Sequence, residues 1–154
     1  MSEAHRATQT QIPVKFYIKT VVYHPESKEP ENFELILFGH YQHTANATYL
    51  RYQEVMDVGT VNTTIKLSHN DDEMVILRNG AMKMRMVFRP NKQVSGAYHT
   101  ENGYMEIVTE AKSFAYQHND QTNEGTINLT YDLSMQEILA GTYNLEIKYK
   151  EERK

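Results

Sequence analysis

Basic residues without acidic neighbours are the part of this sequence best suited to chemistry. The 27 residues from Met74 to Thr100 contain no Asp or Glu, yet they carry five basic residues: Arg78, Lys83, Arg85, Arg89 and Lys92. This segment is +5 and the whole chain is −4, so the other 127 residues sum to −9. Arginine suits carboxylate and phosphate groups, because its planar fork donates to two oxygens at once. The pattern therefore indicates an anion site.

The dipeptide Asn79-Gly80 predicts how these charges are arranged. Between two β-like segments it is a strong signal for a two-residue hairpin turn, because a type I′ turn needs positive φ at both central residues. Such a turn sets the register of the two strands. Arg78, Lys83 and Arg85 are then expected to share one face of the hairpin.

Two interpretations of this basic cluster stay open. In the first, it is a solvated outer face that takes its ionic partners from the acidic remainder of the chain, with Glu54 or Glu106 as the source. In the second, it is an anion- or ligand-binding site. The candidate residues for that site are Arg51, Lys66, Arg78, Lys83, Arg85 and Glu54.

The opposite face of the predicted hairpin is apolar. It carries Met82, Met84, Met86 and Phe88. Alternating methionines make a soft surface that repacks around varied shapes, which makes these four residues candidates for the lining of a cavity. The alternative is that they fill an ordinary core.

The sequence offers little for catalysis. It contains no Cys and none of the common nucleophile, phosphate-loop, dinucleotide or zinc-protease motifs. His40 and His43, three residues apart, fall on opposite faces of a strand and cannot chelate one ion. We therefore expect no cofactor, no metal and, on balance, no enzymatic activity. An acid–base pair of Glu54 with a tyrosine at a barrel mouth is a distant third interpretation.

The elements that must position these residues are β-strands. Apolar and polar residues alternate strictly in 60–68, 82–88, 126–133 and 142–150, and no window supports a long helix. This alternation is typical of antiparallel sheets with one buried face. Ten or eleven strands joined by short turns predict a meander, and closing a meander removes its edges. We expect an all-β, up-and-down barrel of about 8–10 strands, with a β-sandwich as the alternative.

Length and charge bound the remaining properties. The 154 residues suit one domain, expected over 12–150, with a flexible segment at 1–11 and a charged tail at 151–154. No apolar run is long enough to cross a bilayer, so we expect a cytoplasmic protein without membrane contact. The net charge of −4 argues against binding of duplex DNA. Nothing in the sequence predicts an oligomeric state.

Several segments resemble one known family. They include Tyr49-Leu50-Arg51-Tyr52-Gln53-Glu54, Val61-Asn62-Thr63-Thr64-Ile65-Lys66 and the stretch 76–85, together with 96–100, 103–109, 131–133 and 141–143. Over about residues 12–150 the chain is similar to the YwiB-like family, small uncharacterised proteins of Gram-positive bacteria. The resemblance implies a calycin-type barrel, similar to lipocalins and fatty-acid-binding proteins, and implies no activity. The chain has no Trp and therefore lacks the Gly-x-Trp motif of lipocalins.

These observations favour a non-catalytic barrel that binds a small, anionic ligand. The alternative is an interaction protein whose basic hairpin, 74–92, docks an acidic partner, either a protein or an RNA. The polarity of the barrel interior separates the two, because charges that converge inside favour a ligand and charges on an outer strip favour a macromolecule.

Overall fold

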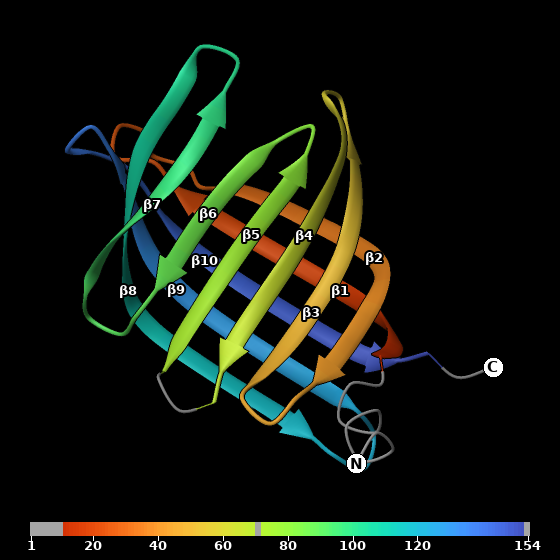
Figure 1. The fold of residues 1–154 in the computed structure, drawn as a ribbon. Helices are drawn as coiled ribbons and strands as arrows, with labels where there is room; N and C mark the ends of the chain where they lie inside the picture. The colour runs from red at the N-terminus through yellow and green to blue at the C-terminus, as the bar shows by residue number, and fades with distance from the viewer. Residues whose placement is uncertain (1–10, 70–71, 153–154) are drawn as a thin grey trace.

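Ten antiparallel strands close into one barrel in this computed structural model, which describes residues 11–69 and 72–152. The strands are β1 (Gln11–Tyr23), β2 (Glu31–His43), β3 (Ala47–Met56), β4 (Gly59–Ser68), β5 (Glu73–Gly80), β6 (Lys83–Phe88), β7 (Gln93–Thr100), β8 (Gly103–Asn119), β9 (Glu124–Met135) and β10 (Ile138–Glu151). Each strand pairs with its neighbours in the chain, and β1 pairs with β10 to close the ring (Figure 1). The predicted all-β barrel is confirmed.

The meander gives the barrel two ends. The turns at 24–30, 57–58, 81–82, 101–102 and 136–137 lie at one end, called here the upper end because it is at the top in Figure 1. The other four turns lie at the lower end, where the chain also enters β1 and leaves β10. Of the terminal segments expected from the sequence, residues 1–10 and 153–154 lie outside the described residues.

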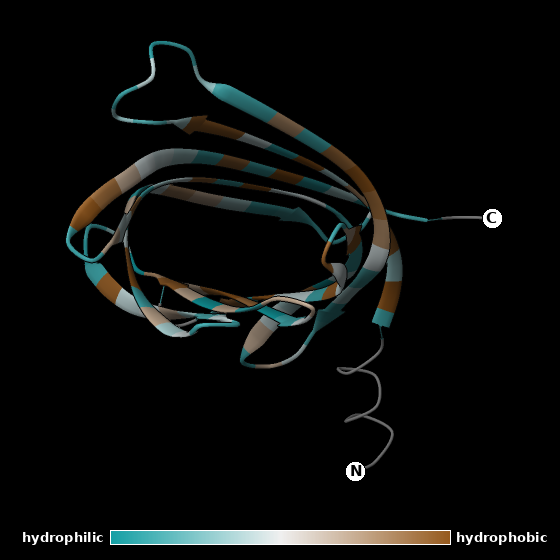
Figure 2. Cartoon of the chain, turned by 90° about the horizontal axis from the view of Figure 1, so that it is seen from above, coloured by the Kyte–Doolittle hydropathy of each residue, from teal (hydrophilic) through white to brown (hydrophobic). Residues whose placement is uncertain are grey.

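Strand alternation places the core inside the ring. Hydrophobic and hydrophilic positions alternate along much of the sheet (Figure 2), although β2 and β5 also contain continuous apolar runs. The middle and lower parts of the interior are filled with side chains that are at most 2% exposed, among them Phe16, Leu50, Ile65, Ile127 and Ile147. Burial of these apolar side chains is the main stabilising contribution to the fold.

Two local features differ from the sequence expectation. Of the ten or eleven strands expected, ten are present in the described residues, because Gly103–Asn119 forms one strand, β8, with an irregularity between Ala111 and Ser113. The two-residue turn with positive φ at both positions lies at Gln136-Glu137, with φ of 51° and 67°. Asn79-Gly80 does not form such a turn, and this changes the register of the hairpin described next.

Candidate functional site

Arg78 lies on the inner face of the barrel. Along β5 it follows Met74 and Ile76, both buried, at every second position. Its cross-strand neighbours are Thr63 on β4 and Met84 on β6. The side chain is half-buried near the upper end, where β5 approaches its turn.

The predicted grouping of Arg78 with Lys83 and Arg85 is wrong. Arg78 pairs with Met84, not with Ala81, because the turn takes more residues than Asn79 and Gly80. The N–H of Ala81 instead donates to the carbonyl of Thr60 on β4, which draws the turn toward that strand. The register differs by three residues from the predicted one, and an odd shift moves a side chain to the opposite face of a sheet.

The other four basic candidates lie outside the barrel. Lys83 and Arg85 are exposed on the outer face of β6. Lys66 and Arg51 face outward on β4 and β3. The Arg51 guanidinium donates to Oε1 of Gln42 at 2.6 Å and stacks over the Tyr49 ring, 4.9 Å from its centroid. The six predicted residues therefore do not form one cluster.

The methionine face points inward. Met86 and Phe88 are buried and Met84 is half-buried beside Arg78. Met82 lies in the turn, and its sulfur is 3.9 Å from Nη1 of Arg78. Met84, Met86 and Phe88 thus line the interior, and Met82 lies at its rim.

Within the part of the chain that the structure describes, Arg78 takes part in none of the ion pairs. Its Nε is buried and has no hydrogen-bond partner there, and the same holds for Oγ1 of Thr63, its neighbour across the ladder. Buried polar atoms in native proteins are nearly always hydrogen-bonded, and a buried charge is normally paired. Among residues 11–69 and 72–152, the guanidinium on the inner face of the barrel therefore has no counterion within ion-pair distance.

Two buried tyrosines experience the charge of Arg78. Burial raises the pKa of the Tyr52 hydroxyl to about 12, with Arg78 acting against this shift and Glu54 adding to it. Burial also raises the pKa of the Tyr131 hydroxyl, again opposed by Arg78. Both phenols stay protonated at neutral pH and keep their donor protons.

Glu54 faces the interior with Tyr52, since both residues lie on the same face of β3. It forms no ion pair with Arg78. Glu106 is the other acid considered from the sequence, and it accepts a hydrogen bond from Ser95 at 3.3 Å. Ser95 lies on the opposite face of β7 from Gly96 and Tyr98. Neither carboxylate pairs with Arg78.

A surface groove lies close to this region, where β2 and β3 separate. Its volume is about 460 Å³, and its lining includes Phe38 and Gly39 of β2, Arg51 and Tyr52 of β3, and Thr63 of β4. The ladder between β2 and β3 ends at the pair Gly39 and Tyr52. The groove therefore reaches the two positions, Tyr52 and Thr63, that continue the ladder from Arg78.

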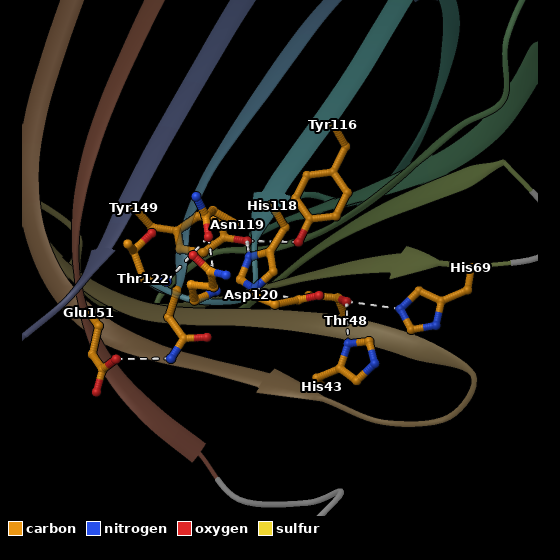
Figure 3. A network of polar contacts seen from close by, with 12 residues as sticks. His43, Thr48, His69, Tyr116, His118, Asn119, Asp120, Thr122, Tyr149 and Glu151 are labelled. Atoms are coloured by element: carbon orange, nitrogen blue, oxygen red, sulfur yellow. Dashed lines mark hydrogen bonds and ion pairs between the residues drawn. The ribbon is translucent and has the colours of Figure 1, made fainter.

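A second polar network occupies the lower end of the barrel (Figure 3). His118 binds the Tyr149 hydroxyl through Nδ1 at 2.7 Å, and its Nε2 lies 3.5 Å from the Asp120 carboxylate. The Tyr149 hydroxyl also binds that of Tyr116 at 2.7 Å. Burial lowers the pKa of His118, and Asp120 opposes that shift.

Beside it, Thr48 joins two histidines. Its hydroxyl lies 2.9 Å from Nε2 of His69 and 3.3 Å from Nδ1 of His43, and the two imidazole rings stack with centroids 4.8 Å apart (Figure 3). Within residues 11–69 and 72–152, no three metal-ligating side chains come together. Sequence reasoning missed this network because its members lie up to about a hundred residues apart and meet only through strand pairing.

The chain is thus a closed ten-stranded β-barrel protein with an arginine on its inner face. Residues 17–147 match the family described as "Domain of unknown function (DUF1934)", and the chain belongs to this family. It is 29% identical over 143 residues to the "Uncharacterized beta-barrel protein YwiB" of Bacillus subtilis (strain 168), covering 91% of this chain and 94% of that one. The resemblance drawn from the sequence is confirmed.

The fold agrees with a solved relative. The crystal structure of the ywiB protein from Bacillus subtilis superposes with a TM-score of 0.81 at 26% sequence identity, covering 97% of this chain and 99% of the other. No helix long and apolar enough to span a bilayer occurs in the described residues.

Proposed function

We propose that this protein is a calycin-like barrel that binds a small anionic ligand in the upper part of its interior, with Arg78 as the charged anchor. The observation that carries the proposal is the buried Nε of Arg78, which has no acceptor among the described residues. A carboxylate or phosphate group supplies two oxygens that match the guanidinium fork. The same group would neutralise a charge that is otherwise costly to bury.

The surroundings of Arg78 support a small ligand over a macromolecule. Thr63, Tyr52 and Tyr131 offer hydroxyl groups on the inner face, and Met84 gives a deformable apolar wall. A barrel of this size holds at most one small ligand. The net charge of −4 supports the exclusion of duplex DNA, and the proposed setting is the cytoplasm.

A thermal-shift panel tests the proposal. Inorganic phosphate, dicarboxylates and nucleotides, each at millimolar concentration, are added to the wild type, to Arg78→Met and to Lys83→Met. Lys83→Met is the matched control, since it removes the same charge from the outer face of the adjoining strand. A ligand at a hundred times its Kd stabilises by about 2.7 kcal/mol, which for a domain of this size is roughly 5–10 °C in Tm.

We expect at least one anion to raise the Tm of the wild type and of Lys83→Met, and none to raise that of Arg78→Met. Without ligand, Arg78→Met should be as stable as the wild type or more so, because the substitution leaves no carboxylate stranded. Absence of any shift in the wild type, or an undiminished shift in Arg78→Met, would contradict the proposal.

One observation favours a second function, the docking of an acidic partner on the basic hairpin. Lys83 and Arg85 project outward from β6, where an acidic protein or RNA could contact them. Arg89, in the same basic segment, is already paired with Glu73 at 2.7 Å, and Arg78 points inward. Retention of an RNA by the wild type and its loss in Lys83→Met would favour this docking function over the interior site.

A further inference from the structure

The ring of strands closes through a short β2–β3 ladder, which leaves a seam where the first half of β2 and the end of β3 are not paired with each other. Pairing between these strands covers only Gly39–His43 with Thr48–Tyr52. Residues 31–38 of β2 are hydrogen-bonded to β1 alone, and residues 53–56 of β3 are paired with β4 alone. When the barrel is seen from above, one hairpin stands outside the ring of the other strands (Figure 2). Its polar turn and apolar strands identify it as the β1–β2 hairpin.

The free edge of β2 exposes large apolar side chains on both faces. Phe33 and Leu35 on the inner face are 51% and 41% exposed, and Ile36 and Phe38 on the outer face are each 59% exposed. A long hydrophobic edge strand is the feature that soluble proteins usually shorten, charge or cover. Its unpaired backbone groups are best satisfied by another extended strand.

We infer that this edge pairs with the same edge of a second copy of the chain, forming a two-fold symmetric dimer with a continuous sheet across β2 and β2′. Every second residue of an antiparallel strand directs its backbone groups toward a given neighbour. In a pair of identical strands, odd-numbered residues therefore face odd-numbered ones and even face even. One residue must then lie directly opposite its own copy, and the two-fold axis passes between the two. Glu34, Leu35 and Ile36 lie at the centre of the edge and are the candidates.

Charge and length select Leu35. An axis at Glu34 would place two carboxylates directly opposite each other, which is destabilising. An axis at Ile36 would use only residues 34–38 of the free edge, whereas an axis at Leu35 uses residues 32–38. That register places Leu35 opposite Leu35′, Phe33 opposite Leu37′ and Glu34 opposite Ile36′, so apolar side chains meet on the inner face and no like charges are paired.

The partner is the same chain because the edge is complementary to itself. Under one rotation the seven residues 32–38 pair with their own copies, and Phe33, Leu35 and Leu37 meet apolar counterparts on the inner face, as an isologous interface requires. The inference concerns β2 and does not depend on what Arg78 binds.

Cysteine cross-linking tests the inference directly, since the chain has no cysteine of its own. Directly opposed residues in an antiparallel pair have Cα atoms about 4.5–5.5 Å apart, which suits a disulfide. We expect Leu35→Cys to form a covalent dimer rapidly with oxidised glutathione. Ile36→Cys, whose counterpart across the interface is Glu34′, and Tyr104→Cys, 62% exposed on β8, serve as controls and should cross-link slowly.

Sedimentation equilibrium supplies the second measurement. The wild type should be dimeric in the micromolar range, and Leu35→Glu, which opposes two carboxylates on the axis, should be monomeric and still folded by circular dichroism. Ile36→Lys should remain dimeric, because its ammonium faces Glu34′. A monomeric wild type, a dimeric Leu35→Glu, or cross-linking of Tyr104→Cys as fast as that of Leu35→Cys would overturn the inference.

Discussion

Burial lowers the pKa of His118 at the lower end of the barrel, and a pKa that differs between the folded and unfolded chain couples protonation to folding. Its imidazole lies against the Tyr41 ring, with centroids 4.8 Å apart and planes within 4°, and it binds the buried Tyr149 hydroxyl. A proton added to this ring brings a charge into a partly desolvated place, near His43. Asp120 compensates only in part, because it is almost fully exposed.

We expect the free energy of unfolding to fall as the pH is lowered from about 7.5 to about 5. The pKa of His118 is lower in the folded than in the unfolded chain, where it is about 6.5. Its contribution is complete above the unfolded pKa and is lost as the pH falls toward the folded pKa. Urea unfolding at a series of pH values measures this slope.

His118→Gln cannot titrate and should flatten the slope. His99→Gln, at an exposed position on β7, is the matched control and should leave it unchanged. Equal slopes for the wild type and His118→Gln would assign the acid sensitivity to other groups.

At the scale of the element, β9 and β10 are joined by an unusually close contact. Gly125 lies opposite Tyr149, and a Cβ at Gly125 would overlap the end of the Tyr149 ring. That ring cannot easily move, because it is 2% exposed and its hydroxyl is held by Tyr116 and His118. The glycine therefore makes room for the aromatic network at the lower end.

Gly125→Ala should lower the free energy of unfolding by about 1–3 kcal/mol, the range expected for overpacking a core. A double-mutant cycle with Tyr149→Leu checks the cause. In the Tyr149→Leu background the same glycine substitution should cost much less, because the obstructing ring is gone. An equal cost in both backgrounds would locate the effect in the backbone.

The β5–β6 hairpin shows where sequence reasoning stops. Period-two alternation correctly placed Met84, Met86 and Phe88 on one face, because alternation is local. The face assigned to Arg78 depended on the length of one turn, and that length depends on a hydrogen bond from Ala81 to Thr60 on another strand. The identities of the turn residues alone do not reveal that contact. The inward position of Arg78 could therefore be seen only from the strand register of the structure.

At the scale of the whole molecule, stability is unevenly distributed around the barrel. Leu129 and Leu145 are cross-strand partners on the inner face, and alternation in the sequence predicts both to be buried. Leu129 is 1% exposed, but Leu145 is only half-buried. Leu145 also pairs with Thr20, which lies opposite the exposed Phe33, so it is close to the open part of the ring.

Leu129→Ala should cost about 2–5 kcal/mol in urea unfolding, the range for a fully buried leucine. Leu145→Ala should cost clearly less, because less apolar surface leaves water at this position on folding. Equal losses would mean that the seam is closed in solution and that Leu145 is as buried as its partner.

The pattern of alternation, turns and short connections was sufficient to predict a closed meander, because these signals are local and repeated in every strand. The lower network was not predictable in the same way. Thr48 comes from β3, His69 directly follows β4, and His118 comes from β8. Their meeting depends on the summed register of many ladders.

Closure through β1 and β10 matters for a chain still being synthesised. Nine of the ten ladders join strands adjacent in the sequence and can form as each strand leaves the ribosome. The tenth joins the first strand made to the last, so β1 waits for the final 14-residue strand before its outer edge is protected. A stalled nascent chain that ends before Ile138 therefore exposes the unpaired edges of β1 and β9 together. These edges can bind chaperones or aggregate with other nascent chains on the same mRNA.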